Sequence, residues 1–309
     1  MTEALLTLPS SVRLSECVWR ILGLNPGKFT LQGTNTYLLG KGRKKLLIDS
    51  GEGVPEYVSL LKQTLQESSP DAAISDIIIS HGHRDHWGGI RDILSSVDLN
   101  PDNDIRVHKF PLSTGSCSGH MEHFPSDIDL QPMHHGQIFT ADGVTLRVVY
   151  TPGHTKDHCT FWLEEEQSLF TADCVLGHGS AVFEDLSSYM DGLQQLRQLQ
   201  PKKLYPGHGP VIENGVAKID EYIQHRQYRE QQVIHLMKTN RDRNWTVMDI
   251  VEELYKDYPP SLHLPAAGGI VLHLRKLQKD GLVRTACDVQ MEDMRTKVWE
   301  WHDEETPKV

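Results

Sequence analysis

The chain has 309 residues, of which 38% are hydrophobic and 24% charged, and its formal net charge is −11. This length favours one large domain with a smaller attachment, and the composition is that of an ordinary globular protein. The acidic charge repels polyanions, which disfavours RNA or DNA binding except at a local basic patch or through bound cations.

The cysteines and the N-terminus bear on the compartment. Five scattered cysteines form no CxxC pair, which argues against a disulfide framework and a cysteine-built zinc site: Cys17, Cys117, Cys159, Cys174 and Cys287. No apolar run approaches the roughly 20 residues that span a bilayer, and residues 1–14 resemble neither a signal peptide nor an arginine-rich transit peptide. We expect a cytoplasmic protein without a membrane partner, with mitochondrial import through an atypical signal as the alternative.

Short apolar runs alternate with helical patterns over the first two-thirds of the chain, which is typical of an α/β fold. Buried strands are predicted at residues 45–49, 76–80, 145–150, 168–172 and 203–205. Each is followed by a loop rich in histidine, aspartate or glycine. Because a rigid scaffold positions such loops, we expect the functional site there.

Residues 100–137 break this rhythm with proline, serine, aspartate and histidine, and predict a long surface excursion that could overhang the site. Four of its histidines are expected to bind metal only incidentally and to lie outside the site: His120, His123, His134 and His135.

The last third of the chain predicts a basic helix and a small winged-helix unit. The most basic stretch of the chain contains Arg226, Arg229, Lys238, Arg241 and Arg243. Thr246 and Asp249 form a capping-box variant that starts a helix through Lys256, and a later helix places Ile270, Leu274 and Leu277 on one face before Gly281 ends it. We predict domains at 1–215 and 244–309, joined by a basic helix at 216–243.

A cluster of metal-ligand types follows the second predicted strand, with His81, His83, Asp85 and His86 in six positions. At a strand end, residues two apart share a face, so His81 and His83 can converge on one ion. Asp85 and His86 lie past the bend and point elsewhere, so the spacing suits two metals. Three further candidates follow later strands, namely His154, Asp173 and His208.

These motifs, in this order, resemble the metallo-β-lactamase superfamily over nearly the whole chain. The resemblance implies an α/β fold, an αββα sandwich with two metals between its sheets, and a catalytic domain at 1–215. It implies a first metal on His81, His83 and His154, a second on Asp85, His86 and His208, and Asp173 as the bridge. It also implies that Asp49 orients a ligating histidine from behind rather than ligating.

The ligand types suit two Zn²⁺ ions, with Mn²⁺ or Fe²⁺ as alternatives. Two such ions lower the pKa of a bridging water and stabilise the oxyanion formed on attack, so the expected nucleophile is a metal-bridging hydroxide. Asp85 is the catalytic candidate, because it could orient that hydroxide or receive its proton. Asp157, His158 and His178 are candidates for the substrate pocket, with solvated loop residues as the alternative. Cys174, beside Asp173, is expected to be buried filler.

Residues 25–37, residues 176–185 and the winged-helix tail resemble the β-lactamase-like endoribonucleases, a subgroup of the glyoxalase-II-like branch. Animal members are associated with cleavage of single-stranded RNA, whereas related fungal members act as thioesterases that release polyketides from carrier proteins. The same metal chemistry serves both reactions.

We expect an endoribonuclease whose partner is single-stranded RNA. The basic stretch, His178 and Lys28 would contact phosphates, although a charge run is more commonly a solvated helix face. A thioesterase acting on acyl (polyketide) carrier thioesters is the first alternative, and a non-catalytic winged-helix binding module is the second.

Overall fold

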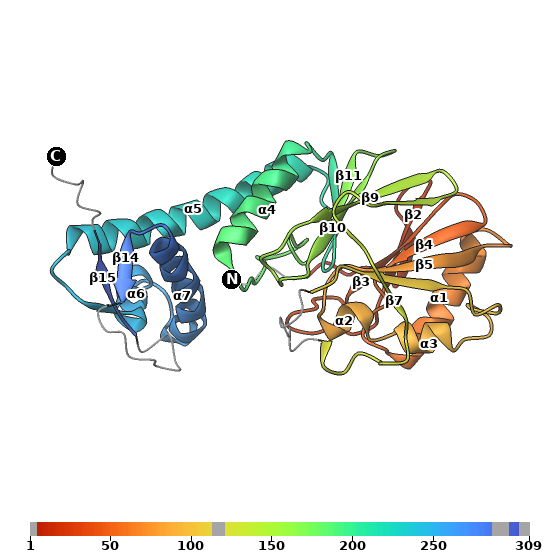
Figure 1. The fold of residues 1–309 in the computed structure, drawn as a ribbon, viewed down its shortest axis with the longest axis horizontal. Coiled ribbons are helices and arrows are strands. Elements are labelled where there is room, and N and C mark those ends of the chain that lie inside the picture. Colours follow the sequence, from red (N-terminus) through yellow and green to blue (C-terminus); the bar gives the residue numbers. More distant parts are fainter. Residues whose placement is uncertain (1–4, 113–120, 286–296, 303–309) are drawn as a thin grey trace. The chain divides into compact units, whose positions relative to one another are not determined.

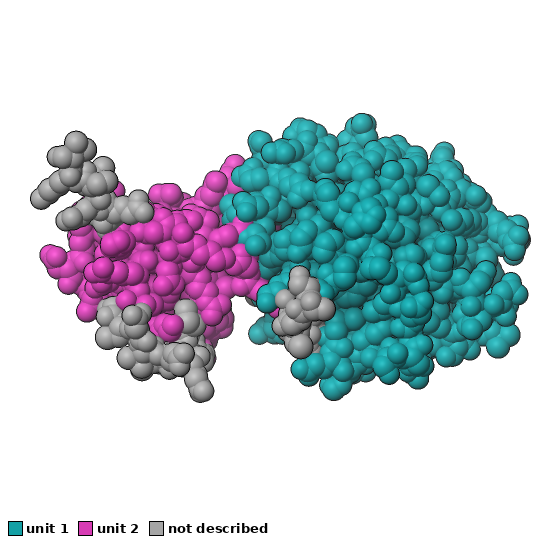
Figure 2. All heavy atoms as spheres, in the orientation of Figure 1, with its two compact units in different colours: residues 1–183, 188–220 teal, residues 184–187, 221–309 magenta. Residues whose placement is uncertain are grey.

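The computed structural model describes residues 5–112, 121–285 and 297–302 (Figure 1). The chain divides into two compact units: unit 1 has residues 1–183 and 188–220, and unit 2 has residues 184–187 and 221–309 (Figure 2). The boundary between the units falls within the predicted connecting helix. This helix is α5 (Gly215–Thr239), and it ends four residues before the predicted end at residue 243. Its later turns belong to unit 2 because Val233 and Met237 join that core. Among the described helices, none is long and apolar enough to cross a membrane.

Unit 1 contains two β-sheets, and all five predicted strands are present. The seven-stranded sheet has, in spatial order, β1 (Ser11–Arg13), β2 (Val18–Leu22), β3 (Asn35–Leu39), β4 (Lys44–Ile48), β5 (Ala73–Ile79), β6 (Arg106–Lys109) and β7 (Leu130–Pro132). The five-stranded sheet has β12 (Lys203–Pro206), β11 (Ser168–Ala172), β10 (Cys159–Leu163), β9 (Val144–Tyr150) and β8 (Ile138–Ala141). Unit 1 also contains the helices α1 (Pro55–Ser68), α2 (Arg84–Trp87) and α3 (Ile90–Leu94), together with all but the first two residues of α4 (Leu186–Gln198).

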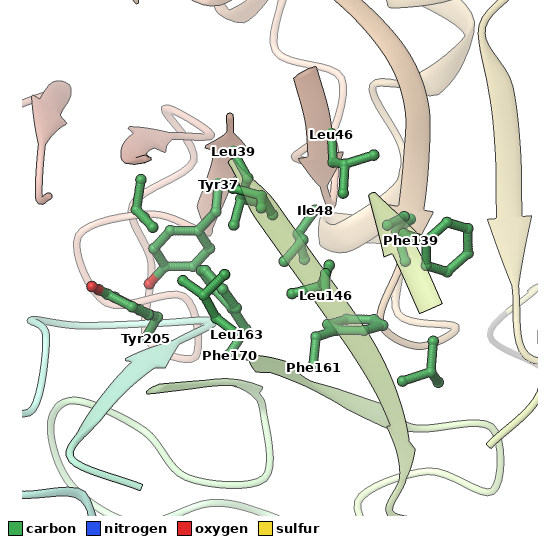
Figure 3. Close-up of a cluster of buried hydrophobic side chains, with 14 of the residues drawn as sticks. Tyr37, Leu39, Leu46, Ile48, Phe139, Leu146, Phe161, Leu163, Phe170 and Tyr205 are labelled. Atoms are coloured by element: carbon green, nitrogen blue, oxygen red, sulfur yellow. The ribbon is translucent and has the colours of Figure 1, made fainter. Parts of the chain in front are cut away.

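The seven-stranded sheet buries apolar side chains on both of its faces. Alternate side chains of a strand point to opposite sides, so one apolar strand contributes to both faces. In β4, Leu46 and Ile48 join the core between the two sheets, which Figure 3 shows together with Leu146 and Phe161 of the smaller sheet. Leu47, between them, packs on the other face with Leu61 of α1. The two sheets therefore share one core while α1 covers the outer face of the larger sheet, as the α/β prediction requires.

The prediction of a surface excursion at residues 100–137 is wrong in part. β6 and β7 lie within it and extend the larger sheet, with Val107 of β6 paired in parallel with Ile77 of β5. The sequence does not predict β6 because its apolar run is short. This strand forms through pairing with β5 rather than through local hydrophobicity. Residues 113–120, including His120, lie outside the described residues. Three of the four histidines named above for this segment are exposed, namely His123, His134 and His135, whereas His108 of β6 is buried.

Unit 2 has the helices and the ribbon of the predicted winged helix. The capping box is present at the start of α6 (Val247–Leu254), since Thr246 and Asp249 bond each other's backbone N–H. This helix ends two residues before the predicted Lys256. α7 (His263–Lys279), which follows the short 3₁₀ helix η2 (Pro260–Leu262), buries the predicted apolar face. A three-stranded sheet completes the unit, in the order β13 (Trp245–Thr246), β15 (Val298–Trp301) and β14 (Val283–Thr285).

The basic stretch is partly tied down within unit 2. The guanidinium of Arg229 lies 4.2 Å from the ring centroid of Tyr255, and that of Arg243 lies 3.9 Å from the ring centroid of Trp245. Arg243 also lies 3.6 Å from the carboxylate of Asp249. Cation–π contacts of this kind stabilise the unit. Arg229 and Arg243 are therefore not simply part of a solvated face, and the contact of the basic stretch with phosphates stays a prediction.

One buried carboxylate of unit 1, Asp76 in β5, lies away from the predicted site. Its Oδ1 accepts hydrogen bonds from His108 and Arg106, each at 2.8 Å, and its Oδ2 accepts one from Ser75 at 2.7 Å. Burial alone would raise the pKa of this carboxyl, but the three donors outweigh burial and hold it at about 2.

Replacing Asp76 with asparagine should lower the free energy of unfolding at neutral pH by about 2 kcal/mol. A carboxyl whose pKa is lower in the folded state contributes stability above its ordinary value of 3.8 and loses it as the pH falls toward 2. Urea unfolding of both proteins between about pH 4 and pH 2 should show the difference shrinking. A difference that stays constant through this window would contradict the assignment.

Candidate metal centre

The structure brings all seven predicted ligands together at one edge of the two sheets in unit 1. Each follows the end of a strand: His81, His83, Asp85 and His86 follow β5, His154 follows β9, Asp173 follows β11, and His208 follows β12. Their ligand atoms form two groups, and within each group these atoms lie within 4.8 Å of one another. Group 1 is His81, His83, His154 and Asp173, and group 2 is Asp85, His86 and His208.

Group 1 places three imidazole nitrogens in a small triangle. Nε2 of His81 lies 2.9 Å from Nδ1 of His83 and 3.2 Å from Nε2 of His154, and the last two atoms are 3.1 Å apart. His154 Nδ1 lies 2.7 Å from the carbonyl oxygen of Val182 and can donate to it, which leaves Nε2 as the lone-pair nitrogen. Nitrogens of a tetrahedral zinc site are separated by about 3.3 Å, so the triangle has the size of a metal site.

Group 2 is joined to group 1 through Asp173. Nε2 of His86 lies 3.2 Å from Asp85 Oδ2 and 3.3 Å from Asp173 Oδ1. Nε2 of His208 lies 3.4 Å and 3.2 Å from the same two oxygens. Within the described part of the chain, His86 Nε2 and Asp173 Oδ1 are buried without a hydrogen-bond partner. Such atoms cost about 1–3 kcal/mol each, so a bound cation is the natural partner for both.

The electrostatics of the two groups differ. Burial disfavours a charge on His86, but Asp85, Asp173 and Asp49 together raise its pKa well above the ordinary value. Burial and the neighbouring histidines instead lower the pKa of His81, which keeps that imidazole neutral. Carboxylates thus draw a cation to group 2, while group 1 offers the neutral imidazole that ligation requires. The donor set fits two divalent ions.

Asp49 lies behind group 2 and is 1% exposed. Its carboxylate accepts hydrogen bonds from the backbone N–H of Ser80 at 2.8 Å and the Ser80 hydroxyl at 2.8 Å, and it lies 2.7 Å from His86 Nδ1. The contact with Nδ1 turns Nε2 of His86 toward Asp85 and Asp173. This is the position in which a residue supports the site without ligating.

Two residues that hold the site were not singled out from the sequence. The hydroxyl of Thr34 donates to Asp85 Oδ2 at 2.8 Å. The amide of Asn35 donates to the carbonyl oxygens of Pro206 and Gly209, both at 2.8 Å, on either side of the last ligand. The sequence does offer a signal for Thr34 and Asn35, which are adjacent polar residues at the start of an apolar strand. Polar groups buried at such a position need hydrogen-bond partners.

Two of the three predicted pocket residues are buried behind group 1 instead. Asp157 and His158 have no exposed surface, so neither offers a face to a substrate. Asp157 pairs with Lys109, and the His158 ring centroid lies 5.2 Å from that of His81. Burial lowers the pKa of His158 to about 3, so this ring is neutral. The prediction failed because the loop after His154 turns inward to begin β10.

His178, the third predicted pocket residue, is partly exposed. The backbone N–H of Gly177, just before it, donates to the carbonyl oxygen of His208 at 2.9 Å. This places His178 at the rim of group 2, and its contact with a substrate stays a prediction.

Cys174 is buried beside Asp173, as expected. Burial raises the pKa of its thiol to about 12, so the side chain is neutral at physiological pH and is not a thiolate ligand. Cys17 and Cys159 are likewise buried free thiols, while Cys117 and Cys287 lie outside the described residues.

Comparison with known proteins identifies both units. Residues 29–208 match the metallo-β-lactamase superfamily, and residues 246–290 match the β-lactamase-associated winged helix domain. The β-lactamase-like protein 2 homolog of Drosophila melanogaster is 43% identical over 280 residues, 90% of this chain and 94% of that protein. Its Caenorhabditis elegans namesake is 44% identical over 88% and 87% of the two chains. A lactamase-like protein of Aspergillus niger is 42% identical over 76% of this chain and 68% of that protein.

Solved structures agree on the fold. A β-lactamase domain protein from Burkholderia ambifaria superposes with a TM-score of 0.74 at 16% identity, covering 96% of this chain and 95% of that one. A metallo-β-lactamase family protein from Thermus thermophilus superposes with a TM-score of 0.66 at 21% identity, covering 94% of this chain and 100% of that one. The two His/Asp groups are consistent with the binuclear metal site typical of such proteins. By its sequence match, its fold and its ligand groups, this chain belongs to the metallo-β-lactamase superfamily.

Proposed function

We propose that this protein is a dinuclear zinc hydrolase that cleaves single-stranded RNA as an endoribonuclease. The observation that supports the hydrolase most directly is the pair of ligand groups that share Asp173. Imidazole and carboxylate ligands suit Zn²⁺, with Mn²⁺ and Fe²⁺ as the alternatives. When bound, the two ions would activate water at neutral pH and stabilise the negative charge that develops on attack.

Asp85 is the residue that we propose to orient the attacking water. Burial opposes its charge, but His86 and His208 outweigh burial, and they hold the pKa of Asp85 below its ordinary value of 3.8 even though Asp173 repels it. The carboxylate is therefore ionised at neutral pH, and the Thr34 hydroxyl fixes its Oδ2 at 2.8 Å. Such a weak base accepts a proton poorly, so we assign it to positioning rather than to proton transfer.

Two considerations support RNA as the substrate. The Drosophila and Caenorhabditis relatives are 43% and 44% identical to this chain, whereas lactamase-like proteins of the fungi Arthroderma benhamiae and Aspergillus niger are 38% and 42% identical to it. Bound cations would also make the site locally positive, which offsets the net charge of −11 for a phosphodiester. His178, at the rim of group 2, is the side chain that we propose to contact a phosphate.

A thioesterase is the second candidate, and a cavity favours it. A cavity of about 220 Å³ is lined by Lys109, Phe110, Pro111, Leu112, Met121, Leu130 and Pro132. It lies at the carboxyl ends of β6 and β7, the same edge of the sheet at which His81 follows β5. Its walls are almost wholly apolar, so it suits an acyl chain better than a phosphate.

One assay separates the candidates. The zinc-loaded full-length protein is given a fluorogenic single-stranded RNA and, in parallel, an acyl-pantetheine thioester. We expect cleavage within the RNA that EDTA abolishes and restored zinc recovers, with the thioester left intact. Cleavage of the thioester alone would replace the endoribonuclease by the thioesterase. If neither is cleaved, both proposals are wrong, and the winged-helix binding module becomes the remaining hypothesis.

A further inference from the structure

We propose that the buried ion pair between Lys109 and Asp157 is a positioning element for group 1. It holds the loop that carries His154 against the larger sheet and thereby sets the distance between His154 and the histidines that follow β5. The inference rests on the proposed binding of zinc, and it adds that the two metal positions are held by separate contacts.

Group 1 takes its histidines from both sheets. His81 and His83 follow β5 of the seven-stranded sheet, whereas His154 follows β9 of the five-stranded sheet. The separation of 3.2 Å between the Nε2 atoms of His154 and His81 therefore depends on how the sheets are held at this edge. A shift of even 1 Å would spoil a site whose metal–nitrogen distances are fixed to about 0.2 Å.

The ion pair joins the sheets at this point. Lys109 is the last residue of β6 and pairs in register with Ile79, two residues before His81. Asp157 lies three residues after His154. The side chains are 6% and 0% exposed, and Nζ of Lys109 donates to Oδ2 of Asp157. The ion pair thus bridges the two ligand-bearing segments.

Asp157 also organises the loop itself. Its Oδ1 accepts a hydrogen bond from the hydroxyl of Thr155 at 2.7 Å. The carbonyl oxygen of Thr155 in turn accepts one from the backbone N–H of Gly153 at 3.1 Å. These bonds enclose His154, which lies between Gly153 and Thr155, so the carboxylate is connected to the backbone on both sides of the ligand.

Stability alone does not explain this pair. Removing two charges from water costs several kcal/mol per ion, and well-packed apolar residues often stabilise a core at least as well. A backbone hydrogen bond from Cys159 to the carbonyl oxygen of Ser80, at 2.9 Å, already ties the same loop to β5. What the ion pair adds is a directed contact, which fixes the loop geometry beside a ligand.

Group 2 has a separate connection between the sheets. Asn35, at the start of β3, donates to the carbonyl oxygens of Pro206 and Gly209 around His208. The hydroxyl of Tyr37 also donates to the carbonyl oxygen of Pro206, at 2.6 Å. Because β3 and β6 lie apart in the larger sheet, with β4 and β5 between them, each connection should act on its own group.

The test measures zinc affinity one group at a time, by competition with a chromophoric chelator. Two backgrounds isolate the groups: His208→Ala leaves group 1 and His154→Ala leaves group 2. In the first, Asp157→Asn should lower zinc affinity about 10- to 100-fold, the usual effect of removing a residue that orients ligands. In the second, we expect less than about a threefold change, and Asn35→Ala should show the reverse pattern.

Two further variants separate positioning from general damage. The double variant Lys109→Met with Asp157→Leu leaves no unpaired buried charge, so it should keep the melting temperature while losing group 1 affinity. Asp76→Asn removes another buried carboxylate paired with β6, at the opposite end of the strand, and should leave zinc affinity unchanged.

The outcomes separate this inference from the proposed function. Equal losses in both backgrounds, or a similar loss in Asp76→Asn, would show that the ion pair acts through overall stability and would overturn the inference. So would unchanged zinc affinity in Asp157→Asn when the unsubstituted chain binds two zinc ions. If the unsubstituted chain binds no zinc, the proposed function fails, and the inference fails with it.

Discussion

Replacing His83 with alanine should lower kcat/KM for RNA cleavage by about a thousandfold or more, because it removes a ligand from the group that activates water. Nδ1 of His83 lies 2.9 Å from Nε2 of His81 and 3.1 Å from Nε2 of His154, so the remaining pair cannot complete a tetrahedral site. The variant should also bind about one zinc ion fewer per chain.

The fold should survive this substitution. His83 is only partly buried and precedes the short helix α2, so its truncation leaves no large cavity. His123→Ala is the matched control, because this histidine is exposed and lies outside both ligand groups. The control should keep full activity and zinc content. Unchanged turnover in His83→Ala would refute the metal-hydrolase proposal, whereas binding through the winged helix should persist in either variant.

Replacing Asp49 with alanine should weaken both the metal site and the fold. The substitution deprives the two polar groups of Ser80 and the Nδ1 of His86 of a buried acceptor. We expect zinc affinity at group 2 to fall about 10- to 100-fold, because the His86 ring is no longer oriented. The free energy of unfolding should fall by about 3 kcal/mol, the usual cost of breaking a buried charged contact.

Zinc content after dialysis and urea unfolding test this expectation separately. Ser50→Ala is a suitable control, because Ser50 is buried beside Asp49 and its hydroxyl donates to the backbone carbonyl oxygen of His86 at 3.3 Å rather than to a ligand atom. That variant should bind both zinc ions. An Asp49→Ala protein that retains two tightly bound ions would show that the carboxylate does not orient His86.

The alanine variants of His83 and Asp49 probe different levels of one arrangement. His83 supplies a nitrogen to group 1, so its loss should appear mainly in turnover and metal count. Asp49 contacts a histidine of group 2 from behind, so its loss should appear in affinity and stability as well. Comparison of the two separates ligation from orientation, which activity alone cannot do.

Several features of this protein follow from local sequence. The cluster from His81 to His86 is predictable because its four ligands are nearly contiguous and follow an apolar run. The capping box of Thr246 and Asp249 is predictable because its bonds join residues three apart. The five predicted strands appear because each contains apolar residues that become buried when the strand joins a sheet.

Other features depend on contacts between distant residues. β6 forms because β5 offers a pairing edge, although its own residues are largely polar. Asp157 and His158 looked like pocket residues and are buried, because the loop turns inward and Lys109 pairs with Asp157 across 48 positions of sequence. Asn35 reaches the loop of His208 across more than 170 positions.

The sequence by itself therefore determined the seven ligand candidates, since their chemistry and spacing are local properties, and the family resemblance that they carry predicted how they divide into two groups. Only the tertiary structure decided the distances within each group, which oxygens of Asp173 face each group, and which buried side chains hold the ligand loops. The physical reason is that ligand identity resides in single residues, whereas a coordination geometry of a few ångströms is set by long-range packing between two sheets.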